Sequence, residues 1–379
     1  MDTTLKYVPV FRSKQQEITV LKTFQFDNQI YPCLEIIKEL DRKPRHSNST
    51  TQVSLFGKEH GKTFESCYSS VINSISAKKV FIDLPTHLRP SPNMKPESLK
   101  FLRKVITKRD KRTAYLMKLN SLSDKVIPVI SSFQQISGEV ESICLQAQDL
   151  KNSFPSLAYR IMIPTYEQDI LEIKKCIREN DYIFVDYEND EIDENDWEVI
   201  EIKKAIEEIN AHKIIHRYQI PDSMTMTGLE HNERIETIDN SLPFIFKKLG
   251  GHSFSDYVGI KKDNITDGGV QSPGFIFYDA VQNSFFGYRY RYGGHKKGET
   301  KPKLSEFETT IVPAVLDSNA VARMKTAKQN YLDNKNWGWN ILNKIESGKE
   351  NGKNAAKFKR ISMEHYLHCI QQKLRAKEL

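Results

Sequence analysis

Short apolar runs alternate with segments of helical spacing up to residue 262. Between the runs, apolar residues recur every three or four positions, as in Ile170, Ile173 and Ile177. This alternation predicts a parallel sheet, because consecutive parallel strands need a crossover that is usually a helix. The eight runs cover residues 6–14, 30–37, 78–85, 125–132, 157–164, 182–188, 213–221 and 256–262.

Eight such units match a closed, TIM-like (β/α)₈ barrel over residues 1–262. An open doubly wound sheet is the alternative, although no glycine-rich dinucleotide fingerprint follows any of the runs. Past residue 262 the pattern changes to a turn-rich extension with hairpin character over 263–315, and then to a helical tail over 316–379. The sequence therefore predicts an α/β barrel with a C-terminal β-hairpin and a helical extension.

The composition is that of a globular protein and gives limited information about its partners and its cellular compartment. The 56 Lys and Arg residues exceed the 49 Asp and Glu residues, and the formal charge of +7 permits contact with a polyanion without requiring it. The five cysteines are scattered and form no C-x-x-C pair, which argues against a disulfide framework and for a reducing compartment. Because no apolar run approaches membrane-spanning length, we expect a cytoplasmic protein without membrane contact.

Two stretches concentrate charge of one sign. Residues Arg103 to Lys118 carry seven basic side chains against one acid, and residues Asp186 to Glu201 hold nine acids and no base. An acidic first turn followed by Trp197 and Ile200 fits the N-terminus of a helix. Runs of this kind are usually solvated faces or helix starts, so we interpret both as surface.

The ends of the expected strands carry the candidate chemistry. In (β/α)₈ barrels the working residues stand at the C-terminal ends of the strands and on the loops that follow. Carboxylates buried there either bind a divalent metal or act as acid and base while cations hold an anion such as phosphate, or they form internal salt bridges that close the barrel end. Oxygen ligands would favour Mg²⁺, Mn²⁺ or Ca²⁺ over zinc. The candidate catalytic carboxylates are Glu35, Asp83, Asp186 and Asp256, and the candidate anion-binding residues are Arg12, Lys14 and Arg160.

Tyrosine and arginine alternate in the stretch FFGYRYRYGGHKK that begins at Phe285. In an extended chain Tyr288, Tyr290 and Tyr292 share one face, while Arg289 and Arg291 share the other. Aromatic rings beside cations are typical of sites for single-stranded nucleic acid. The same pattern is that of an amphipathic strand with packed tyrosines and solvated arginines. We favour this packed strand and keep Arg289 and Arg291 as candidate nucleic-acid contacts.

Several strings resemble, in order and approximate spacing, the beta protein family. That family looks like the middle component of the three-gene gop, beta and cll antiphage module of phage satellites. It usually has two adjacent histidines near its end, where this chain has His365 and His368. The strings that carry the resemblance are YVPVFRSKQQE, IYPCLEI, DYVGIKK, FIFYDAVQNSFFGYRYR, FETTIVPAV and ISMEHYLH.

The resemblance implies a role in defence and implies no chemistry. The partners would be other proteins of the same operon, with a phage component as the trigger. In one function the barrel is a sensor, regulator or immunity subunit that binds those partner proteins. In the other it is a metal-dependent phosphodiesterase or nuclease-like hydrolase that acts on nucleotide or nucleic acid at the barrel mouth.

Overall fold

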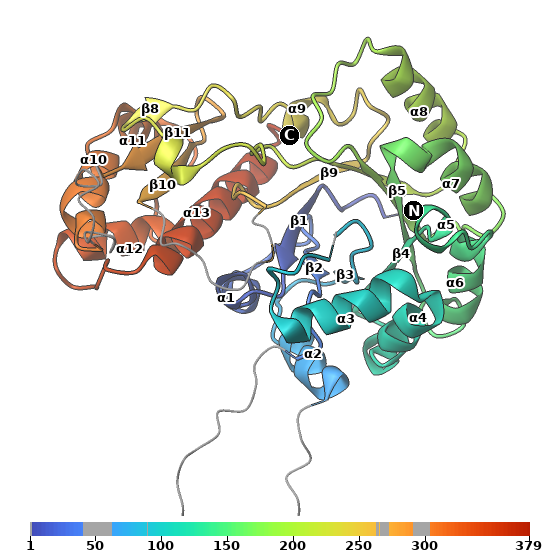
Figure 1. The fold of residues 1–379 in the computed structure, drawn as a ribbon. Coiled ribbons are helices and arrows are strands. Elements are labelled where there is room, and N and C mark those ends of the chain that lie inside the picture. Colours follow the sequence, from blue (N-terminus) through green and yellow to red (C-terminus); the bar gives the residue numbers. More distant parts are fainter. Residues whose placement is uncertain (1, 41–62, 89, 263–264, 266–272, 291–303) are drawn as a thin grey trace, which may run out of the picture.

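The computed structural model describes residues 2–40, 63–88, 90–262, 265, 273–290 and 304–379. Eight parallel strands close into a barrel in the order β1-β2-β3-β4-β5-β6-β7-β9 (Figure 1), which confirms the predicted TIM-like architecture. The barrel strands are β1 (Tyr7–Arg12), β2 (Cys33–Glu35), β3 (Val80–Asp83), β4 (Val126–Ser131), β5 (Ala158–Met162), β6 (Tyr182–Asp186), β7 (His212–His216) and β9 (Ser253–Asp256).

The last barrel strand lies before its predicted position. The run expected at 256–262 contains only the final residue of β9, whereas the first seven strands overlap their predicted runs. Strand β9 reads SFSD, and its two serines bond to histidines of β7. His212 Nε2 lies 3.0 Å from Ser253 Oγ, and His216 Nδ1 lies 2.8 Å from Ser255 Oγ. Because these inward positions are polar, a search for apolar runs could not find this strand.

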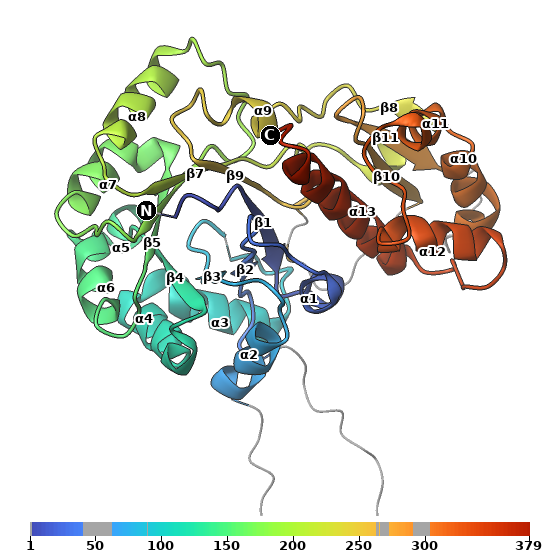
Figure 2. The ribbon, with the colours of Figure 1, turned by 180° about the vertical axis from the view of Figure 1, so that it is seen from behind.

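Helices follow the barrel strands and surround the barrel (Figures 1 and 2). Strands covered in this way are buried on both faces, so β4 has six buried residues with the sequence VIPVIS. Helix α2 begins at a capping box formed by Thr63 and Ser66. The helices are α1 (Gln15–Thr23), α2 (Phe64–Asn73), α3 (Pro96–Thr107), α4 (Arg109–Met117), α5 (Gln134–Ser137), α6 (Ser142–Leu150), α7 (Tyr166–Ile173), α8 (Trp197–Glu207) and α9 (Leu242–Ile245).

A second sheet lies to one side of the barrel (Figure 1). Strands β10 (Gly274–Asp279) and β11 (Ser284–Arg289) form an antiparallel hairpin, and the short β8 (Glu233–Arg234) pairs with β11. This confirms the predicted C-terminal hairpin, and the tyrosines Tyr288 and Tyr290 are buried as predicted. The accompanying helices are a π-helix at Phe307–Ile311, α10 (Val312–Leu316), α11 (Asn319–Thr326), α12 (Trp337–Glu346) and α13 (Ala355–Arg375).

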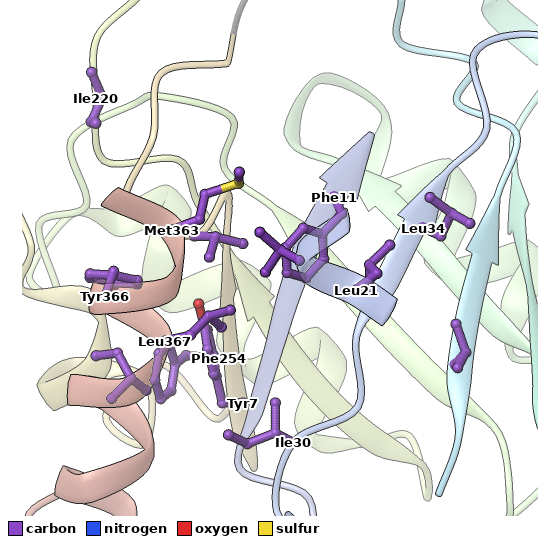
Figure 3. Close-up of a cluster of buried hydrophobic side chains, with 14 of the residues drawn as sticks. Tyr7, Phe11, Leu21, Ile30, Leu34, Ile220, Phe254, Met363, Tyr366 and Leu367 are labelled. Atoms are coloured by element: carbon purple, nitrogen blue, oxygen red, sulfur yellow. The ribbon is translucent and has the colours of Figure 1, made fainter. Parts of the chain in front are cut away.

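The long helix α13 packs between the barrel and the second sheet (Figures 1 and 2), where it contacts α1 and β10. Met363, Tyr366 and Leu367 of this helix lie beside Phe11 of β1 and Phe254 of β9 (Figure 3), and all five are fully buried. Each such side chain stabilises the fold by about 1.5–3 kcal/mol relative to an exposed one. The predicted helical extension is therefore part of the hydrophobic core and covers one side of the barrel.

Candidate functional site

The barrel interior ends in a layer of polar side chains at the C-terminal ends of the strands. Below it, the inward residues of most strands are apolar and buried, as Val8 and Val10 are on β1, and the next inward position on that strand is Arg12. The same alternation brings one residue from each of the first seven strands, and the residue just after β9, to this level. We call this layer the mouth ring, and it consists of Arg12, Glu35, Asp83, Ser131, Arg160, Asp186, His216 and Tyr257.

Arg160 joins the three carboxylates of the ring. Its Nε donates to Asp186 Oδ2 at 2.8 Å, and its Nη1 donates to Asp83 Oδ2 at 2.7 Å and to Glu35 Oε1 at 3.2 Å. All four side chains are at most 4% exposed. A guanidinium has five N–H donors in a fixed plane, so one arginine can hold three carboxylates together.

Two further guanidiniums complete the charge pairing. Arg12 Nε donates to Glu35 Oε2 at 3.0 Å. Arg112 of α4 is fully buried and donates from Nη2 to Asp83 Oδ1 at 3.0 Å and from Nη1 to Gln146 Oε1 at 2.8 Å. The interpretation of the run from Arg103 to Lys118 as surface is thus wrong for Arg112, because this side chain lies on the inner face of α4.

The guanidiniums keep two of the three ring carboxylates ionised, whereas burial raises the pKa of Asp83 despite the opposing effect of Arg160 and Arg112. Burial alone would raise the pKa of Glu35, but Arg12 and Arg160 lower this pKa to about 2. Burial also opposes ionisation of Asp186, yet Arg160 holds the pKa of that carboxyl far below its ordinary range. Both groups are therefore anions at neutral pH, and the ring is a set of formed ion pairs.

Two imidazoles at the mouth are neutral. Burial lowers the pKa of His216 to about 4, and burial together with Arg160 lowers the pKa of His87, in the β3–α3 loop, well below its ordinary value. Their Nε2 atoms lie 3.9 Å from Asp186 Oδ1 and 3.4 Å from Glu35 Oε1, respectively. Neither Nε2 atom forms a hydrogen bond with any residue that the structure describes.

The loop after β9 adds a cation and an aromatic ring. Tyr257 donates its hydroxyl to Glu35 Oε1 at 2.6 Å. Lys262 Nζ lies 4.4 Å from the ring centroid of Tyr218 and 5.3 Å from that of Tyr257, within cation–π range. Burial lowers the pKa of Lys262, although Glu35 and Asp186 oppose this shift.

Asp256, a predicted mouth carboxylate, lies outside the ring. Side chains alternate along a strand, so the inward positions next to it are Ser255 and Tyr257. The Asp256 oxygens instead accept hydrogen bonds from the hydroxyls of Tyr7 at 2.6 Å and of Tyr366 at 2.7 Å. Asp256 therefore connects the barrel wall to α13.

Besides Asp256, three of the predicted site residues are not part of the mouth ring as the structure describes it. Lys14 lies in the β1–α1 loop just past the ring. Arg289 is partly exposed on β11 and donates to the carbonyl oxygen of Thr227, so it belongs to the second sheet. Arg291 and Tyr292 lie outside the described residues. The predicted residues that meet in the ring are Arg12, Glu35, Asp83, Arg160 and Asp186.

Sequence reasoning missed several groups at the mouth. Arg112 carried a usable signal, because Tyr115 and Leu116, three and four residues later, place it on the buried face of its helix. His216 also carried one, since it ends the apolar part of the run KIIH, but that run was extended to residue 221. His87 and Lys262 lie in loops, where no periodicity marks a side chain that points inward.

A metal fits this arrangement poorly. Ligand atoms of Glu35, Asp83 and His87 lie within 4.8 Å of one another, a spacing that would admit a cation. Arg160, however, already donates to both carboxylates from the position between them. A divalent ion would have to displace this guanidinium and would add positive charge to carboxylates that are already paired.

The fold and the ring define a (β/α)₈-barrel protein with a charged mouth and an integral C-terminal lobe. A family model described as Beta protein matches residues 7–371. The chain therefore belongs to the Beta protein family, as the sequence resemblance predicted. No curated protein matches it at a significant level. Among the helices of the described residues, none has both the length and the apolar character needed to cross a membrane.

Proposed function

We propose that this Beta protein is a cytoplasmic sensor or regulator subunit of an antiphage defence module, with the mouth ring as its ligand-recognition site. Membership of the family supports the defence role, through the resemblance to the gop, beta and cll module. Its partners are other proteins of the same operon, and a phage component or a product of infection supplies the trigger.

The observation that carries the sensing site is the pair of buried Nε2 atoms of His87 and His216. A buried polar atom without a hydrogen bond costs about 1–3 kcal/mol, and the large majority of such atoms in folded proteins are paired. A salt-bridge layer that only closed the barrel would need neither imidazole. The two nitrogens are accounted for if a ligand pairs with them, so these unpaired atoms at the mouth support a binding site over a purely structural layer.

The loop after β9 supports a regulatory role, because it connects the mouth to α13. Tyr257 faces the ring, while its neighbour Asp256 is held by Tyr366 of α13. Between the ring and the helix, Val258 has a φ of 57°, a left-handed conformation that is strained for a β-branched residue. A ligand that moves Tyr257 would shift this strained segment and, with it, the lobe that is available to partner proteins.

The second candidate is a metal-dependent phosphodiesterase, favoured by the 4.8 Å cluster of Glu35, Asp83 and His87. It predicts hydrolysis of bis(p-nitrophenyl) phosphate by the purified chain in Mg²⁺ or Mn²⁺, and loss of that activity in EDTA. The position of Arg160 between the two carboxylates argues against it. Metal-dependent turnover that Glu35→Gln abolishes without loss of folding would make the enzyme the better proposal.

Phage plating with the intact gene neighbourhood tests the proposed sensor. His216→Gln removes the imidazole at the mouth, and His212→Gln is the matched control, since His212 is buried on the same strand and bonds to Ser253 at the opposite end of the barrel. We expect His216→Gln to lose protection and His212→Gln to keep it, with similar melting temperatures for the two variants. Protection that survives in both variants would contradict a sensing role for the mouth.

Copurification tests the partner-binding part of the proposal. Tagged wild-type protein, expressed with its gene neighbourhood, should retain another product of the same operon. A wild-type chain that copurifies with no neighbour, before or during infection, would contradict a subunit role whatever happens at the mouth.

A further inference from the structure

The mouth ring also indicates what kind of ligand it takes. We propose that it binds a small organic anion that carries several hydroxyl groups, such as a sugar phosphate or a sugar acid. This inference rests on the proposed function only in taking the ring as a ligand site, and it adds the chemistry of the ligand.

The charge at the mouth favours an anion. The three ring carboxylates, Glu35, Asp83 and Asp186, are matched by the three guanidiniums of Arg12, Arg112 and Arg160, which gives 3 − 3 = 0. The neutral histidines add no charge, and the ammonium group of Lys262 forms no ion pair with a described residue, although the carboxyl of Glu188 lies within electrostatic range of it. A partly buried cation without an ion-pair partner attracts anions.

Lys262 provides the donors for that anion. In the described part of the chain its ammonium makes no hydrogen bond, and it lies over the rings of Tyr218 and Tyr257. An ammonium has three N–H donors, and a ring face satisfies none of them in the way that an oxygen does. A phosphate or carboxylate oxygen would accept these hydrogen bonds and would balance the charge.

The hydrogen-bond polarity at His216 requires donors on the ligand. Ser255 Oγ donates to the carbonyl oxygen of Val8 at 2.7 Å, so it can only accept from His216 Nδ1, 2.8 Å away. Nδ1 of the neutral ring therefore carries the proton and Nε2 carries a lone pair. This lone pair faces Asp186 Oδ1 at 3.9 Å, and both atoms are acceptors.

Of these two acceptors, Asp186 Oδ1 already accepts from the backbone N–H of Glu188 at 2.8 Å, whereas His216 Nε2 has no donor among the described residues. A ligand hydroxyl group placed beside Nε2 would donate to it. Nearby, the polar Nε2 atom of His87 gives a further hydroxyl a partner, because a hydroxyl both donates and accepts. An anion without hydroxyls, such as sulfate, would satisfy Lys262 and leave the imidazole of His216 unpaired.

Four probe compounds, each tested with the full-length purified protein, distinguish the requirement for an anionic group from the requirement for hydroxyl groups. D-ribose 5-phosphate and D-ribonate carry hydroxyls and an anion, D-ribose carries hydroxyls alone, and sulfate carries an anion alone. A ligand that binds only the folded state raises the melting temperature with concentration. We expect one or both of the anionic sugars to raise it and to give a measurable Kd by titration calorimetry, with ribose and sulfate at least about tenfold weaker.

Variants connect the binding to the named residues. Lys262→Gln should remove the preference for the anionic sugar over ribose, and His216→Gln should weaken the anionic sugar by about tenfold or more, since one hydrogen bond to a buried group is lost. Ser255→Ala should also weaken binding of the anionic sugar, because the proton on the imidazole of His216 is then no longer fixed on Nδ1. The effect should be smaller than that of His216→Gln, since the imidazole is still present. His212→Gln should bind as the wild type does.

Several results would overturn the inference. Sulfate that binds as well as the sugar phosphate would refute the need for hydroxyls, ribose that binds as well would refute the anion, and no shift with any probe would refute both. These outcomes are separable from failure of the sensor. If His216→Gln loses protection but the wild-type protein binds no anionic sugar, only the ligand class is refuted. If the wild-type protein binds the anionic sugar but His216→Gln keeps full protection, only the defence role of the mouth is refuted.

Discussion

Replacing Arg112 with methionine tests whether the ring depends on the second guanidinium that holds Asp83. The side chain is fully buried, and its loss removes one of the two cations on Asp83 and leaves the Gln146 Oε1 and Leu84 carbonyl acceptors without this donor. Removing one partner of a buried ion pair costs about 3–5 kcal/mol. Each of the two acceptors left unpaired adds about 1–3 kcal/mol. The total of about 5–11 kcal/mol is comparable with the 5–15 kcal/mol that stabilises a typical protein.

The matched control is Arg109→Met on the same helix, because Arg109 pairs with Glu139 and Asp149 at the surface. Exposed pairs contribute about 0–1 kcal/mol. Urea denaturation of both purified variants, followed by circular dichroism, measures the difference in unfolding free energy. If Arg112→Met lies within about 1 kcal/mol of Arg109→Met, the ion pair with Asp83 does not hold the ring together, and the pairing argument for the mouth fails. If Arg112→Met is insoluble, the double variant with Asp83→Asn should recover folding, since the number of buried carboxylates then again equals the number of guanidiniums that pair with them.

Three further outcomes are expected. The pKa of Glu35 is lowered from 4.5 to about 2, so its ionised form stabilises the fold by about 3 kcal/mol above about pH 4.5. This stabilisation is lost as the pH falls toward 2. Glu35→Gln should therefore lack that acid-sensitive step in denaturation curves. Tyr366→Phe should cost about 1.5–3 kcal/mol in urea denaturation, because it removes a hydrogen bond to the buried carboxylate of Asp256 at 2.7 Å, and an unchanged midpoint would contradict this link. Arg289→Ala combined with Arg291→Ala should leave binding to DNA and RNA unchanged, whereas a fall of about 2 in the slope of log K against log salt concentration would restore the nucleic-acid interpretation.

The barrel was predictable because its strands are buried on both faces. Runs such as VIPVIS at β4 contain little but apolar residues, and the helices between the strands keep the spacing of an amphipathic surface. The exception is β9, whose inward serines pair with His212 and His216. Apolar runs identify a strand only when its inward side chains are apolar, so the strand that supplies hydrogen-bond partners to the imidazoles was the one displaced.

The sequence could predict the site residues that lie at or near the end of a recognisable strand, and it did not predict those that lie in loops or on helices. Arg12, Glu35, Asp83 and Asp186 could be found because each ends a recognisable strand, and Arg160 because it is the charged residue in the apolar run of β5, two residues before the strand ends. The C-terminal ends of parallel strands meet at one end of the barrel.

Which face of the strand a residue occupies depends on register, and a shift of one position moves a side chain from the interior to the outside. Along β9 that single position separates Tyr257, which donates to the ring, from Asp256, which anchors α13. The sequence predicts correctly that Asp256 lies at the C-terminal end of a barrel strand. The pleat of the strand then determines that Asp256 bonds to Tyr366 of α13, whereas its neighbour Tyr257 bonds to Glu35 of the mouth ring.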